Sequence, residues 1–227
     1  MNVAAKSQHH IHFGCAATKT TKTFEMLEQT YRDSFATLGY TFSMSHYPEL
    51  RAFELIKRGQ IDGLCGVSER NHNKHLKQQI LIKHSIASSR IQLWSRKPFT
   101  LSPDRNTPSL LDLNLGYHRG GLSDEGFDNI QFKKKTKIKG VGEGFKMMLS
   151  GRIDALASFE FYLLEVSRSL SINTDSLHKE TLANINFHPV LSADSAIDPV
   201  NFTHALSGTI EMEGKIDETS VMPSGEE

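Results

Sequence analysis

Two stretches of this sequence, AFELIKRGQIDGLCGV at residues 52–67 and GFKMMLSGRIDALASF at residues 144–159, match each other at an offset of 92 residues. In both, apolar residues at helical spacing lead to a glycine, which is followed by Ile-Asp and a small residue. The apolar residues seat a helix on a sheet, the glycine permits a left-handed C-cap, and the Ile-Asp step begins a buried strand. Seven of the sixteen aligned positions match, five by identity and two by similar apolar residues, which is more than two unrelated helix–strand units usually share. The match therefore predicts two similar units in one chain.

The sequence around this repeat alternates between strand and helix patterns. Strands are predicted at residues 11–16, 40–45, 61–67, 113–117, 153–158 and 185–192, with extended segments at 81–82 and 86–95. Helices are predicted at residues 23–38, 49–58, 123–129, 144–150, 160–170 and 199–213. Polar residues at 68–79 and a Pro-, Ser- and Thr-containing stretch at 98–109 predict loops. This order predicts an α/β fold of two lobes, each a mostly parallel sheet flanked by helices.

The composition restricts the class of function. The chain has 227 residues with 26 Lys plus Arg and 26 Asp plus Glu, so it lacks the basic excess of a typical nucleic-acid-binding protein. The lysine-rich run at 133–139 is short and is interpreted as a solvated face. No apolar run approaches the ~20 residues that cross a bilayer, and residues 1–10 contain no apolar core of a signal peptide. The sequence leaves open a cytoplasmic protein and an exported one whose leader has been removed.

Polar and aromatic residues follow the strand of each repeat unit. Ser68-Glu69-Arg70 comes after the first strand, and Phe159-Glu160 ends the second. Ligands of open α/β sheets bind beyond the carboxyl ends of the strands. If the two lobes face each other, these two sets line the cleft between them.

Three stretches, at residues 51–63, 67–70 and 147–155, resemble the type II periplasmic solute-binding proteins that serve importers of polar amino acids. The resemblance extends over nearly the whole chain in the order of elements and is sharpest at the Gly-x-Ile-Asp signature. With it we predict that residues 1–95 and 190–227 form lobe 1 and residues 96–189 form lobe 2. The strands near 92–95 and 187–190 are predicted to be the hinge, and binding is predicted to close the lobes over the ligand.

The resemblance also implies a set of ligand-binding residues. Ser68 and Arg70 are expected to hold a ligand carboxylate, because the planar guanidinium fork pairs bidentately with that group. Gly121, in a Gly-Gly turn, is expected to offer backbone N–H groups to an anionic part of the ligand. The alternative for Arg70 is a surface arginine without a ligand, and the alternative for Gly121 is an ordinary turn.

The second lobe departs from the family pattern. Members of the family place an acid at the end of the second repeat strand to meet the ligand's ammonium, but here Phe159 stands at that place with Glu160 next to it. Either Glu160 turns inward, or the ligand has no ammonium there and an aromatic side chain stacks on its body. Phe159 and Tyr117 are the aromatic residues expected to contact the body of the ligand.

Other polar residues have structural interpretations. Asp62 and Asp154 occupy matching positions at the starts of their strands, far from the cleft end, and are expected to form local hydrogen bonds. Trp94 is expected in the core rather than on a cleft wall. The histidines near the N-terminus are expected to belong to a disordered lead-in, and no metal site is predicted because the spacing of the histidines matches no known motif.

The two cysteines, Cys15 and Cys65, lie at comparable heights on the first and third strands. These strands are expected to be neighbours, about 4.8 Å apart, which brings the Cα atoms close together. Two buried free thiols are the default expectation, with a disulfide as the alternative.

We therefore predict a non-enzymatic, monomeric periplasmic protein without cofactor or metal. It binds an amino acid or another small carboxylate for delivery to the permease of an ABC importer. The alternative is a ligand-sensing domain of a receptor or membrane kinase with the same fold, and the third reading is an enzyme such as a dehydratase.

Overall fold

The computed structural model describes residues 9–17, 19, 21–99, 109–118 and 131–213. The chain divides into two compact units, one formed by Met1–Ser88 with Asn186–Glu227 and the other by Ser89–Ile185. Strands β5 and β9 each continue from one unit into the other, because their ranges include these boundaries. The division falls a few residues earlier in the chain than the boundaries expected from the sequence. The predicted hinge strands stay a prediction.

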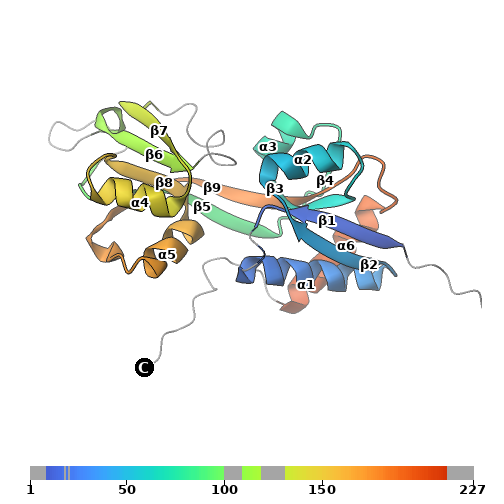
Figure 1. The fold of residues 1–227 in the computed structure, drawn as a ribbon. Helices are drawn as coiled ribbons and strands as arrows, with labels where there is room; N and C mark the ends of the chain where they lie inside the picture. The colour runs from blue at the N-terminus through green and yellow to red at the C-terminus, as the bar shows by residue number, and fades with distance from the viewer. Residues whose placement is uncertain (1–8, 18, 20, 100–108, 119–130, 214–227) are drawn as a thin grey trace, which may run out of the picture. The chain divides into compact units, whose positions relative to one another are not determined.

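Unit 1 is a sheet with helices on both faces (Figure 1). Its strands are β1 (His10–Cys15), β2 (Thr41–His46), β3 (Gly63–Ser68), β4 (Ile80–Leu81) and the end of β9 (His178–Leu191). Its helices are α1 (Lys22–Thr37), α2 (Glu49–Lys57), α3 (Glu69–His75) and α6 (Pro199–Glu213). The strand order is β2-β1-β3-β9, parallel between the first three strands and antiparallel where β9 meets β3 and β4.

Two clusters of side chains hold unit 1 together. Helices α1 and α6 pack on one face of the sheet, where Phe35 stacks on Phe202 with ring centroids 4.7 Å apart. Helix α2 packs on the opposite face through Phe53 and Ile56. Position 63, at the start of β3, requires glycine, because a Cβ atom there would lie 2.3 Å from the ring of Phe13.

Unit 2 has the same kind of architecture. Its strands are β5 (Ala87–Ser95), β6 (Asn114–His118), β7 (Lys134–Ile138), β8 (Ala155–Phe159) and the first part of β9. Its helices are α4 (Val141–Leu149) and α5 (Glu160–Ser169). Short 3-10 turns occur at Leu110–Asp112 and Thr174–Ser176. The order is β5-β8-β6-β7, with β6 parallel to β7 and β8 and with β5 antiparallel to β8. Helices α4 and α5 cover one face, where Trp94 is fully buried against Phe145, so the core interpretation of Trp94 is confirmed.

The repeated sequence forms the same local structure twice. Gly59 and Gly151, after α2 and α4, have φ angles of +64° and +76°, the left-handed conformation predicted for them. Asp62 donates its N–H to the carbonyl of His12 and accepts the N–H of His12 on its carboxylate, both at 2.8 Å. Asp154 makes the equivalent pair of bonds with Asn114, at 2.9 and 2.8 Å. The two aspartates therefore join neighbouring strands, which confirms their structural role.

Two local predictions were wrong, and one strand was not predicted. Residues 68–79 were expected to be a loop, but Glu69–His75 forms α3, which begins at the side-chain cap of Ser68. The interpretation of the lysine-rich run as a solvated face is confirmed, because its lysines are exposed. The run also contains β7, which pairs with β6 and for which the side-chain pattern gave no signal. The N-terminal histidines were assigned to a lead-in, yet His10 and His12 lie in β1. The predicted helix at 123–129 lies outside the described residues.

Candidate functional site

In unit 1 the predicted site residues lie at the junction of β3 and α3. Ser68 is buried, with 4% of its surface exposed, and its hydroxyl oxygen accepts the N–H of Asn71 at 3.2 Å. Asn71 is also buried and donates to Glu49 at 3.0 Å, which ties α3 to the first turn of α2. Arg70 follows on the exposed side of α3. The structure therefore places Ser68 as a helix cap and Arg70 at an exposed position of α3.

In unit 2 the predicted site residues lie at the junction of β8 and α5. Phe159 ends β8, and Glu160 is the first residue of α5. Arg90, on β5, donates from Nε to one carboxylate oxygen of Glu160 and from Nη2 to the other, each at 2.6 Å. Gln92 donates a third hydrogen bond at 3.0 Å. The carboxylate of Glu160 is thus engaged within unit 2.

The aromatic residues of this junction gather together. Phe159 and Tyr117 contribute to one hydrophobic cluster of unit 2, with Tyr117 the more buried of the two. The ring of Phe159 also stacks on that of Phe161, with centroids 5.6 Å apart, and Phe161 contacts Tyr162 at 4.0 Å. Gly121 lies outside the described residues.

Sequence reasoning missed four residues of this region. Arg90 and Gln92 alternate with apolar residues along β5, and polar residues inside an apolar strand are a usable signal for a buried polar contact. Phe161 and Tyr162 follow Glu160 directly, but helical spacing alone assigns such aromatics to the core.

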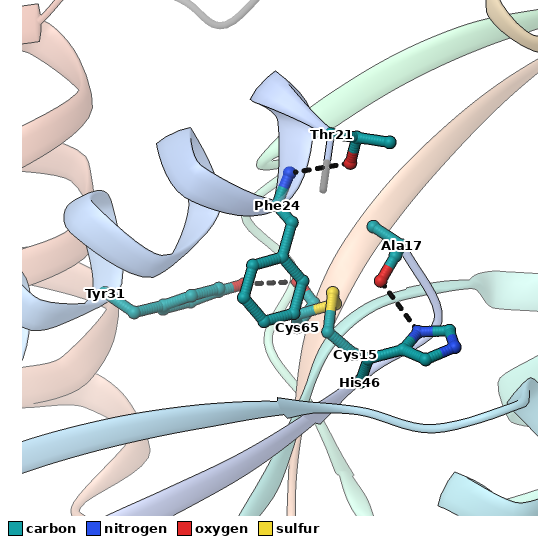
Figure 2. The surroundings of a disulfide bond; sticks show 7 residues. All are labelled: Cys15, Ala17, Thr21, Phe24, Tyr31, His46 and Cys65. Atoms are coloured by element: carbon teal, nitrogen blue, oxygen red, sulfur yellow. Dashed lines mark hydrogen bonds between the residues drawn. A yellow bond between two sulfur atoms is a disulfide. The ribbon is translucent and has the colours of Figure 1, made fainter. Parts of the chain in front are cut away.

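The two cysteines form a disulfide (Figure 2). Their Cα atoms are 5.1 Å apart, which confirms the predicted closeness and the pairing of β1 with β3, while the expectation of two free thiols is wrong. Both residues are buried, and the hydroxyl of Tyr31 donates to the carbonyl oxygen of Cys65 beside them. Complete burial raises the pKa of Tyr31 well above its usual value. The disulfide thus fixes β1, near its carboxyl end, to β3.

The histidines of β1 point toward one hydroxyl group. Nε2 of His10 and Nδ1 of His12 lie 2.7 and 3.1 Å from the hydroxyl oxygen of Ser43. Burial, and then the neighbouring charge of His10, lower the pKa of His12, while Asp62 acts in the opposite direction. Across the described residues, the structure brings together no group of three His, Cys, Asp or Glu side chains suited to a metal ion. The helices within the same residues include none that is long and apolar enough to span a membrane.

The comparisons with known proteins concern the fold. No protein-family model matches the sequence, and no curated protein matches it. Among solved structures, the ligand-binding core of GluR0 in complex with L-glutamate superposes with a TM-score of 0.69 at 12% identity, covering 92% of this chain and 95% of that one. A histidine kinase sensor domain with similarity to periplasmic binding proteins gives a TM-score of 0.67 at 15% identity, covering 92% and 93%.

A substrate-binding protein of an ABC uptake transporter from Streptococcus pneumoniae, with bound histidine, gives a TM-score of 0.64 at 15% identity and covers 91% of this chain and 88% of that one. Each similarity extends over both units and nearly the whole of each chain. The chain therefore has the α/β fold of the type II periplasmic binding proteins.

Proposed function

We propose that this protein binds a small solute. The observation that carries the proposal is the fold, which is shared over nine-tenths of the chain with proteins whose names state bound amino acids. The residues involved are those at the carboxyl ends of β3 and β8, where ligands of open α/β sheets bind.

A carboxylate is the proposed anchor group of the solute. Arg70 is the exposed cation at the β3–α3 junction, and a guanidinium pairs bidentately with a carboxylate. Phe159 and Tyr117 supply apolar surface at the β8 end of unit 2. Gly121 is proposed as a donor of backbone N–H groups.

The disulfide supports an extracytoplasmic location. Disulfides persist in oxidising compartments such as the periplasm and are rare in the cytosol. We therefore propose a periplasmic location. We also propose that the protein is monomeric, releases its solute to the permease of an ABC importer and catalyses no reaction.

A second candidate function is ligand sensing, and a specific observation favours it. The histidine kinase sensor domain matches this chain over 92% of its length, as fully as the transport proteins do. Deleting the gene distinguishes the two roles. Loss of uptake of the labelled solute supports transport, whereas unchanged uptake with loss of a transcriptional response to the solute supports sensing.

A thermal-shift screen tests the proposed binding. The panel contains amino acids, other small carboxylates, sugars and nucleosides. A ligand at 100 times its dissociation constant adds about 2.7 kcal/mol, which raises the Tm of a chain of this size by about 5–10 °C. Arg70→Ala is expected to abolish the shift given by a carboxylate. Arg51→Ala, which removes another exposed arginine of unit 1, is the matched control and is expected to retain the shift. Shifts only with uncharged ligands, or an unaffected Arg70→Ala variant, would contradict the proposed anchor.

A further inference from the structure

The carboxylate of Glu160 is held in one orientation. Arg90 donates two hydrogen bonds of 2.6 Å to it, in the bidentate geometry that makes guanidinium–carboxylate pairs strong. The Glu160 side chain is 13% exposed, whereas that of Arg90 is 45% exposed. The acid is therefore the covered partner, and its charge is balanced by a cation of the same unit.

Gln92 connects the Arg90–Glu160 pair to the buried core of unit 2. Gln92 donates to Glu160 at 3.0 Å and accepts a hydrogen bond from the indole N–H of Trp94 at 2.8 Å. Trp94 is fully buried, so it cannot shift without disturbing the core. A ligand ammonium directed at Glu160 would meet a carboxylate that already accepts three hydrogen bonds and whose charge is balanced by Arg90.

An aromatic surface begins at the same turn of the chain. The rings of Phe159 and Phe161 are nearly parallel, at 18°, and the ring centroid of Tyr162 lies 4.0 Å from that of Phe161 and 6.4 Å from that of Phe159. All three residues are partly exposed. Partly exposed rings in such an array stack favourably on a further aromatic ring.

From these two features we infer that the solute is an aryl carboxylate without an ammonium group. The aromatic body contacts Phe159, Phe161 and Tyr162, and the acid of unit 2 is occupied by Arg90. This inference rests on the proposed function and gives it a substrate class.

The test is a calorimetric titration with four compounds that all carry a carboxylate. 3-Phenylpropanoate and L-phenylalanine share an aromatic body and differ in the ammonium, and 4-methylpentanoate and L-leucine form the aliphatic pair. 3-Phenylpropanoate is expected to bind about tenfold more tightly than L-phenylalanine, whose ammonium would be desolvated without a free acid. It is also expected to bind more tightly than 4-methylpentanoate.

Two variants test the two features separately. Phe161→Ala is expected to weaken binding of 3-phenylpropanoate about three- to tenfold, the contribution of one aromatic pair. Leu164→Ala, on the same helix but packed against the core behind it, is the control and should leave this affinity unchanged.

Arg90→Ala removes the guanidinium that pairs with Glu160 and is expected to increase the affinity for L-phenylalanine relative to 3-phenylpropanoate about tenfold. Arg32→Ala, which removes an arginine that forms a single-contact ion pair with Glu28 in unit 1, should not change this ratio. The folding of each variant is checked by circular dichroism.

The outcomes separate this inference from the proposed function. Tighter binding of L-phenylalanine than of 3-phenylpropanoate, or an unchanged ratio in Arg90→Ala, overturns the inference and leaves the binding function standing. Failure of all four compounds also overturns it, and the broader thermal-shift panel then decides whether the protein binds solutes at all.

Discussion

Reducing the disulfide between Cys15 and Cys65 is expected to lower the free energy of unfolding by about 4 kcal/mol. The two cysteines are 50 residues apart in the sequence, so the bond closes a large loop in the unfolded chain. Loop-closure entropy alone gives a stabilisation of this size for such a loop at 25 °C. The cysteines lie in the main cluster of unit 1, with Phe24 and Tyr31, and this cluster should retain its packing on reduction.

Urea denaturation followed by circular dichroism measures this effect. For a denaturant dependence of about 3 kcal/mol per molar, the midpoint should fall by about 1.3 M when a reductant is added. A variant with both cysteines replaced by alanine should denature near the reduced midpoint and should not respond to the reductant. A shift below 0.3 M, or an equal shift in the double variant, would refute the assignment of this stability to the bond.

Three further perturbations follow from the repeat and from β1. Asp62→Ala and Asp154→Ala should each lower stability by about 1–3 kcal/mol, because each leaves a strand N–H without its acceptor; equal urea midpoints of variant and wild type would contradict this. Gly59→Ala and Gly151→Ala should each lower the Tm by a few degrees, since alanine at a positive φ costs about 1 kcal/mol, and a calorimetric scan without change would exclude the left-handed caps. The lowered pKa of His12 means that the folded state disfavours its protonation, so this contribution to stability is complete above the unfolded pKa of 6.5 and is lost as the pH falls below it. His12→Asn should flatten the decline in stability between pH 7.5 and 5, and an unaltered profile would rule out His12 as its source.

The sequence pattern within each segment was enough to predict most of the helices and strands. The repeat around Gly59 and Gly151 located two helix–strand units, and their hydrogen bonds agree in the structure almost atom for atom. Two elements, β7 and α3, lacked such a pattern. Strand β7 has the lysine-rich sequence KKTKI and forms through backbone pairing with β6. Helix α3 has the sequence ERNHNKH, with no apolar residue, and depends on the cap of Ser68 and on the bond between Asn71 and Glu49.

The candidate site was less predictable because its contacts join distant parts of the chain. Glu160 is paired with a residue 70 positions earlier, and nothing in the alternation of β5 indicates which acid its arginine meets. The strand order placed Cys15 near Cys65, but proximity alone does not decide between thiols and a disulfide. The contacts of three further residues of the region, Gln92, Phe161 and Tyr162, could be identified only when β5, β8 and α5 were seen together.

Solute binding is the central claim, and isothermal titration of the small carboxylates that raise the Tm tests it most directly. The account predicts saturable binding of one molecule per chain, with heat that disappears in Arg70→Ala and persists in Arg51→Ala. The absence of saturable binding by any compound of the panel, in a protein that unfolds cooperatively, would contradict it.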